Sequence, residues 1–192
     1  MDDDLRGMRV AFVVANEGVE QIELTAPWNV LQAAHATLEL VAPETSSVRA
    51  LQHLDLGERF GVDRRTSEIA ARDVDGIVLP GGVVNADRLR TDRPAVHFVH
   101  EAAAHGTPIA VICHAPWTLI DAGAVAGRTL TSWASLRTDL TNAGAEWVDR
   151  AVVVCDEGPG PLISSRGPDD LDEFCATVLR VFSARGAPLG AR

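Results

Sequence analysis

The sequence predicts an α/β protein whose central sheet is mostly parallel and is covered by helices on both faces. Short apolar runs rich in Val and Ile recur along the chain, such as MRVAFVVA at 8–15 and GIVL at 76–79. Such runs lack the polar alternation of half-exposed strands and are typical of strands buried on both faces. Segments with helical periodicity separate them, and this alternation favours parallel βαβ units.

The elements follow one another without a repeat or a Pro/Gly/Ser linker, so we expect a single domain over residues 1–192. The predicted strands cover 8–15, 37–42, 76–79, 109–113, 152–154 and 162–164. The predicted helices cover 18–34, 92–106, 115–121, 137–143 and 170–184. The polar stretch 43–73 is expected to hold a small hairpin around 48–51 and 60–63.

Composition limits the classes of partner. The net charge of −10 argues against nucleic acid or an anionic membrane, since both favour clustered Lys and Arg. The uncharged stretch 106–120 is too short for a membrane span and contains prolines. Three widely spaced cysteines do not form a disulfide framework, and the acidic N-terminus shows no secretory signal. We therefore expect a cytoplasmic protein with reduced thiols.

Cys113 is the strongest candidate for chemistry. It ends the apolar run IAVIC, just before the predicted helix that starts with APW. The free amide groups and positive dipole end of a helix favour a thiolate over a thiol, and the thiolate is the nucleophile. A cysteine at this position is therefore predicted to be reactive. The alternative is a cysteine that only fills space in the core.

Three polar neighbours are candidates to assist the thiol. His114 follows Cys113 directly and, unless it is a capping or surface histidine, would need a third group to orient its ring. Glu20 and Glu23 are spaced i, i+3 and would share one face of the first predicted helix. Either a solvated acidic first turn or a carboxyl beside the thiol fits this spacing. We expect Glu23 to be the one that faces Cys113.

Other candidates are weaker. Cys155 and Cys175 fit a core role, and His97 and His100 lack the Cys or carboxylate neighbours of a metal site. The segment 158–161 (GPGP) is a loop rather than a dinucleotide fingerprint. The sequence contains neither a Gly-x-Ser-x-Gly element nor a phosphate loop, so no cofactor and no metal are expected.

Five segments together resemble the DJ-1/PfpI superfamily, and most closely its PfpI branch. They are AFVVANEGVEQIELTAP, IVLPGGVVNADRLR, IAVICHAPW, TLTSWASLRTDLTNAGAEWVD and ISSRGPDDLDEF. The resemblance extends over nearly all of residues 8–183. It implies a flavodoxin-like three-layer sandwich and a homodimer, which in some members assembles further.

The resemblance also implies roles for single residues. Cys113 matches the family's nucleophile, His114 the following histidine, and Glu23 the glutamate that approaches the cysteine, with Glu20 as its neighbour. In the PfpI branch an acid in the turn after PGG reaches the histidine of the partner subunit, and Asp87 matches it here. This turn is one residue longer than in the PfpI pattern. Ala115 stands where glycine is common.

Three hypotheses on function follow. In the first, the Cys113 thiolate adds to a small reactive carbonyl or to its protein adduct, as in glyoxalase and deglycase chemistry. Backbone amides after Gly82 and at Ala115 would then stabilise the oxyanion. In the second, Cys113, His114 and Asp87 cleave peptides. In the third, Cys113 is a non-catalytic stress sensor that is oxidised to the sulfinic acid.

Overall fold

A seven-stranded sheet forms the centre of the molecule. The computed structural model describes residues 4–186. The strand order is β11-β12-β8-β7-β1-β3-β6, and within the described residues every neighbouring pair is parallel except β11 with β12. The strands are β1 (Arg9–Val13), β3 (Thr37–Ala42), β6 (Arg64–Arg65), β7 (Gly76–Leu79), β8 (Ile109–Ile112), β11 (Val152–Cys155) and β12 (Leu162–Ser165). The predicted mostly parallel α/β architecture is confirmed.

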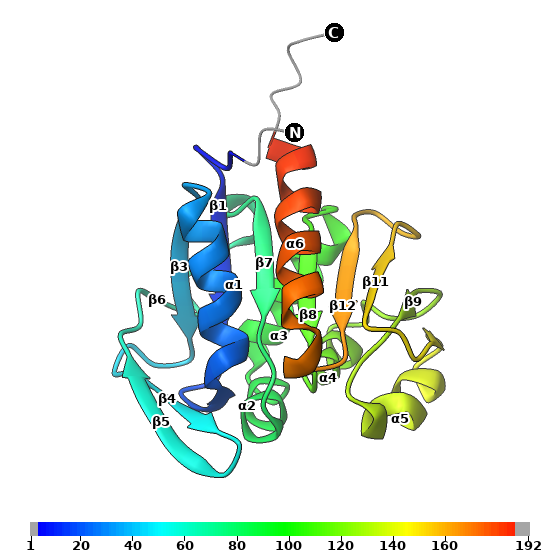
Figure 1. Ribbon diagram of the computed structural model, residues 1–192, viewed down its shortest axis with the longest axis horizontal. Helices are drawn as coiled ribbons and strands as arrows, with labels where there is room; N and C mark the ends of the chain where they lie inside the picture. The colour runs from blue at the N-terminus through cyan, green and yellow to red at the C-terminus, as the bar shows by residue number, and fades with distance from the viewer. Residues whose placement is uncertain (1–3, 187–192) are drawn as a thin grey trace, which may run out of the picture.

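Helices cover both faces of this sheet (Figure 1). On one face lie α1 (Gln21–Ala33) and α6 (Leu171–Gly186), which pack against each other. On the other face lie α2 (Val83–Leu89), α3 (Arg93–Ala104) and α4 (Pro116–Asp121), with α5 (Arg137–Asn142) at the end of the sheet. Alternate residues of β1 serve the two cores: Val10 and Phe12 pack toward α1 and α6, and Ala11 and Val13 pack toward α3.

Small sheets and short helices complete the fold. One sheet contains β2 (Glu17–Glu20), β4 (Val48–Gln52) and β5 (Asp55–Phe60), and another pairs β9 (Thr129–Leu130) with β10 (Glu146–Trp147). The predicted hairpin is present, but its second strand starts at Asp55, because a tight turn with His53 in a left-handed conformation (φ 59°) closes it. The 3₁₀ helices are Ala71–Asp73, Ala134–Leu136 and Pro168–Asp170.

Two predicted segments differ from the structure in ways that matter for the site. Helix α1 starts at Gln21 rather than at residue 18, because residues 17–20 are extended and pair with β4. The segment after Pro80 is not a loop throughout, since α2 begins directly after Gly82. Asp87 therefore lies on a helix. No helix in the described part of the chain is long and apolar enough to cross a membrane.

Candidate active site

Cys113 lies at a strained elbow between β8 and α4. Its backbone is left-handed (φ 62°), a conformation that costs a non-glycine residue about 1–3 kcal/mol. Backbone hydrogen bonds hold it there: Cys113 N–H donates to the Ser165 carbonyl (3.0 Å), and Trp133 N–H donates to the Cys113 carbonyl (3.0 Å). The surrounding structure thus fixes the thiol at the carboxyl end of the sheet, where parallel α/β sheets bind ligands.

The elbow also brings His114 onto the sulfur. Cys113 Sγ lies 3.0 Å from His114 Nδ1, although neighbouring side chains in a helix would point apart. The His114 ring is buried beside Trp117 and Trp133, with ring centroids 5.4 and 5.7 Å away. Burial lowers the pKa of His114, so its imidazole is neutral near pH 7. A neutral imidazole can accept the thiol proton.

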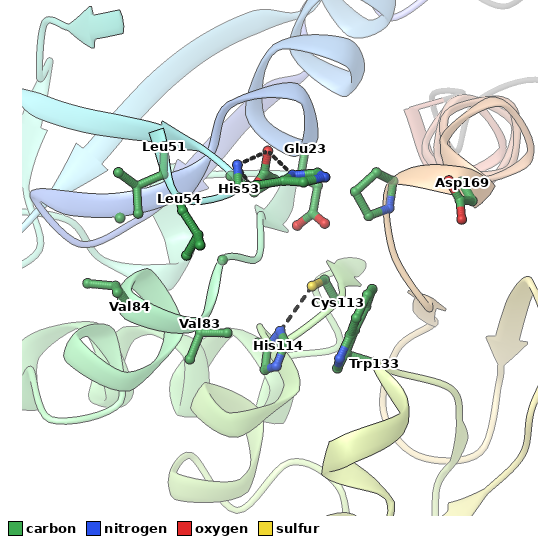
Figure 2. Close-up of a pocket in the computed structure, with 14 residues that line it drawn as sticks. Glu23, Leu51, His53, Leu54, Val83, Val84, Cys113, His114, Trp133 and Asp169 are labelled. Atoms are coloured by element: carbon green, nitrogen blue, oxygen red, sulfur yellow. Dashed lines mark hydrogen bonds and ion pairs between the residues drawn. The ribbon is translucent and has the colours of Figure 1, made fainter. Parts of the chain in front are cut away.

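Glu23 approaches the thiol from the first turn of α1. Its side chain is fully buried, and its Oε2 accepts a hydrogen bond from Gly81 N–H (2.8 Å). The other oxygen, Oε1, has no hydrogen-bond partner within the described part of the chain. Burial raises the pKa of Glu23 to about 8. The carboxyl is therefore protonated at neutral pH and can donate a proton toward the sulfur or a sulfur-bound atom (Figure 2).

The expected lowering of the Cys113 pKa by a helix N-terminus is not what the site produces. Burial raises the pKa of the Cys113 thiol, and the charge of an ionised Glu23 raises it further. Helix α4 has only six residues, and its first residue, Pro116, has no N–H to offer. The amides of Gly82 and His114 act in the opposite direction and favour the thiolate. The thiolate therefore forms most readily while Glu23 keeps its proton.

The backbone amides near the thiol are only partly those predicted. The amide of Gly82 itself, rather than one after it, faces the sulfur. The Ala115 amide does not, because it donates to the Ile112 carbonyl (3.1 Å). The prediction of Ala115 as an oxyanion donor is therefore wrong, and the second amide that faces the sulfur is that of His114.

Gly81, in the same turn, is the point where the backbone comes closest to Cys113 and Glu23. A Cβ there would lie 2.6 Å from Cys113 Cβ and would also collide with the Glu23 carboxyl. Only glycine therefore allows this turn to approach both side chains.

Glu20 and Glu23 do not share a helix face. Glu20 is the last residue of β2, and its Oε2 accepts a hydrogen bond from His53 N–H (3.1 Å). The His53 ring adds a longer contact, with Nδ1 3.8 Å from Glu20 Oε1. Glu20 thus anchors the tip of the β4–β5 hairpin, and Glu23 is the carboxyl beside the thiol.

Asp87 lies apart from this cluster within the chain. It is exposed on α2, and it has no ion pair with His114 in the described residues. Within one subunit, then, the structure joins Cys113, His114 and Glu23 but leaves the fourth predicted residue outside.

These groups line a pocket of about 420 Å³ (Figure 2). Its walls combine apolar side chains with three carboxyl groups, and no Lys or Arg lines it within the described residues. Sequence reasoning missed three of the side chains on its rim: His53, Trp133 and Asp169. Trp133 and Asp169 lie in TLTSWASLR and ISSRGPDDLDEF, two of the segments that carry the family resemblance, so the resemblance could have identified them. His53 had no signal, because the hairpin turn alone brings it to the site.

A buried cysteine at a strand-to-helix elbow, beside a histidine and a protonated carboxyl, defines an α/β protein with a candidate nucleophile site. The family model described as "DJ-1/PfpI family" matches residues 8–181. The chain belongs to this family.

Known relatives agree with this assignment. The chain is 37% identical over 164 residues to Deglycase PfpI of Pyrococcus furiosus, covering 85% of this chain and 93% of that protein. A protein of Staphylococcus haemolyticus is 35% identical over 178 residues, covering 92% and 98%.

Solved structures show the same fold. The Drosophila melanogaster DJ-1beta crystal structure superposes with a TM-score of 0.80 at 25% identity, covering 93% of this chain and 91% of that one. Schizosaccharomyces pombe DJ-1, at 24% identity and a TM-score of 0.77, covers 96% of this chain and 100% of that one. The predicted flavodoxin-like fold is therefore confirmed.

Proposed function

We propose that this protein is a cysteine-dependent enzyme that acts on small reactive carbonyls or their protein adducts, as a deglycase or a glyoxalase-like enzyme. The observation that carries the proposal is the contact between Cys113 Sγ and His114 Nδ1 (3.0 Å) beside the buried, protonated Glu23. The similarity to Deglycase PfpI supports the same class of reaction. The role would belong to a stress response that removes reactive carbonyls.

The first step is addition of the thiolate to a carbonyl carbon. His114 takes the thiol proton, a C–S bond forms, and the carbonyl π bond becomes an alkoxide. The amides of Gly82 and His114 are placed near the sulfur, where they can stabilise this negative charge. Glu23 then gives its proton to the alkoxide, and the product is a hemithioacetal.

For a 2-oxoaldehyde such as methylglyoxal, the remaining steps are redox neutral. Glu23, ionised after that donation, removes the proton from the sulfur-bearing carbon and returns it to the neighbouring carbon, while the hydroxyl proton of the hemithioacetal moves to the oxygen of that neighbouring carbon. The resulting thioester is cleaved by water, which releases a 2-hydroxy acid and restores the thiol. No external oxidant or reductant is needed.

A peptidase is the less favoured alternative. The site pocket has a volume of about 420 Å³, within the range of pockets for small ligands. Residues of the β4–β5 hairpin and of α2 border it. The volume suits a small carbonyl compound better than an extended peptide.

Oxidation sensing is supported by one observation of its own. Glu23 Oε1 has no partner, so a protonated carboxyl can donate to an oxygen added to the Cys113 sulfur. Oxidation of the thiol would then give a hydrogen-bonded sulfinic acid. Intact mass after mild peroxide treatment tests this role, and modification of Cys155 or Cys175 in place of Cys113 would contradict it.

We further propose that the site is completed in a homodimer, in which Asp87 of one subunit orients His114 of the other. His114 has no carboxylate partner among the described residues of its own chain, and Asp87 is exposed and available.

Turnover of methylglyoxal by purified protein tests the proposed function. The Cys113→Ala variant is expected to lose all measurable activity. Cys175→Ala, a matched change of a second buried cysteine on α6, is expected to keep it. Equal turnover by wild type and Cys113→Ala would reject a thiol-dependent mechanism.

A further inference from the structure

A second pocket of about 300 Å³ adjoins the catalytic pocket. Gly18, Leu51 and Val84 line both, so the two pockets lie side by side along these residues. Their charges differ. The catalytic pocket is lined by carboxyl groups and by no Lys or Arg, whereas Arg49 and Arg59 line the second. A change in the sign of the charged side chains between two neighbouring pockets points to a ligand with two chemically different ends.

Arg49 and Arg59 form an unusual pair. They are direct partners in the antiparallel register of β4 and β5, an arrangement in which like charges are destabilising. Arg49 donates to the Gly57 carbonyl (2.9 Å) and Arg59 to the Ser47 hydroxyl (2.9 Å), and both acceptors are neutral. Neither guanidinium forms an ion pair within residues 4–186.

The nearby carboxylate of Glu17 does not neutralise Arg49 and Arg59. Glu17 on β2 is paired in register with Arg49 and lines the same pocket. Its carboxylate, however, forms an ion pair with Arg88 of α2 (2.9 Å). The charges of Glu17 and Arg88 cancel, and the two arginines on the hairpin keep a net positive charge that faces the pocket.

We propose that Arg49 and Arg59 bind the anionic end, a carboxylate or a phosphate, of an elongated substrate whose reactive group is held at Cys113. Paired guanidinium groups suit such oxyanions because their N–H groups match the oxygens in geometry and charge. The inference rests on the proposed function for the identity of the reactive group. It adds the class of substrate: a carbonyl compound with a distal acid group.

The side chains between Cys113 and the two arginines are apolar, which suits a substrate with an apolar segment between its reactive group and its anionic end. Leu51 is two residues after Arg49 on β4, a rise of about 7 Å, and the alternate residues Val48 and Ala50 are buried. Leu51 and Val84 therefore stand between the thiol and the arginines, as Figure 2 shows for their position beside the catalytic pocket.

Alkylation of Cys113 tests the subsite without requiring turnover. The probes are N-iodoacetyl ω-amino acids of increasing chain length, their uncharged primary amides, and the matching aminoalkyl phosphonates. The thiolate displaces iodide and forms a C–S bond, and the rate and saturation constant are followed by intact mass with peptide mapping to Cys113. The proteins are wild type, the double variant Arg49→Gln/Arg59→Gln, and Arg65→Gln, which removes an exposed arginine on β6 as the control.

Short anionic probes are expected to react more slowly than their amides, because the carboxyl groups of the catalytic pocket repel them. At the length that reaches the hairpin, the preference should reverse, with saturation at about tenfold lower concentration for the anion. The reversal should vanish in the double variant and persist in Arg65→Gln. The series, carboxylate or phosphonate, whose saturation constant falls further relative to the uncharged amides identifies the preferred anionic group.

Other results would overturn the subsite. A constant preference at every length, or a reversal that survives the double substitution, means that the arginines bind no anion of the probe. A double variant that shows unchanged probe selectivity but an altered solution mass means that the pair serves a contact between two copies of the chain. Failure of methylglyoxal turnover alone would leave the alkylation result intact, so the two proposals fail separately.

Discussion

The carboxyl of Glu23 and the thiol of Cys113 share one buried volume, so protonation of one governs that of the other. The pKa of Glu23 is raised to about 8 by burial, and ionisation of Glu23 raises the pKa of the thiol. A proton on Glu23 therefore favours a thiolate next to it, and the same proton is available to the alkoxide that forms when the thiolate adds to a carbonyl. On the proposed mechanism we therefore expect the pair to act as a unit below about pH 8.

The stability of the fold should depend on pH through Glu23. Its pKa in the folded state is above the ordinary value of 4.5, so the folded chain binds more protons between these values and loses stability as pH rises from about 5 to 8. Glu23→Gln removes this titration and keeps an acceptor for Gly81 N–H. We expect its melting temperature to exceed that of wild type by several degrees at pH 8 and by less at pH 5.

Thermal unfolding of wild type and Glu23→Gln at pH 5, 6, 7 and 8 tests this prediction. All other carboxyl groups are present in both proteins, so their effect on the pH dependence of the melting temperature is the same. Two curves that stay parallel over this range would contradict a raised pKa for Glu23.

The same substitution should separate thiol reactivity from turnover. Above about pH 8, where Glu23 is ionised in wild type, the variant has no carboxylate beside the thiol, so its Cys113 should ionise more readily and react faster with iodoacetamide at pH 9. Turnover should nevertheless fall by about 10²–10⁴, because the proton donor is gone. The pH profile of alkylation and kcat for methylglyoxal measure the two effects. A variant that loses both in proportion would show that Glu23 acts only through the structure of the site.

At the scale of elements, the turn from β7 into α2 sets the distance between the carboxyl and the thiol. Gly81 N–H holds Glu23 Oε2, and Gly82, with φ 92°, directs its amide toward the sulfur. The conformation of Gly81 and Gly82 thus positions the Glu23 carboxyl of α1 relative to the Cys113 thiol at the elbow after β8.

Gly81→Ala should therefore displace both reacting groups. We expect turnover to drop at least about 100-fold, since small misplacements have effects of this size, and stability to fall by about 1–3 kcal/mol from crowding. Gly61→Ala is the matched control, because a Cβ at Gly61 meets nothing within 4 Å. Denaturant titration and methylglyoxal kinetics give the two quantities. Wild-type turnover in Gly81→Ala would mean that the turn tolerates a shift and does not position the site.

At the scale of the whole molecule, the proposed homodimer can be tested by complementation. Asp87→Asn should lower activity without changing the melting temperature, because Asp87 is exposed. Asp156→Asn, also exposed, should leave activity unchanged. Mixing Cys113→Ala with Asp87→Asn, after dissociation and reassembly, should raise activity above that of either variant alone to about a quarter of the wild-type value, since half of the random dimers hold one complete site. No recovery from a mixture shown to exchange subunits would place Asp87 outside the site.

Local pattern was sufficient for most of the fold. The strands at 37–42 and 76–79 and the helix capped by Asp92 lie where periodicity and capping chemistry predict them. The errors fall at β2 and α2, where glycines with positive φ and pairing with a distant strand override the helical pattern. Such pairing depends on residues far away in sequence, so no local signal shows it.

For the site, the sequence by itself determined the candidate cysteine and the family to which the chain belongs, because a cysteine at the end of a buried strand is a local pattern. Only the tertiary structure decided the chemistry around it. The elbow places His114 on the sulfur, the Ala115 amide is already bonded, and burial rather than a helix dipole sets the protonation of Cys113 and Glu23. A pKa depends on the solvent and charges that surround a group, and these come from α1, β7 and β8 together rather than from any one segment.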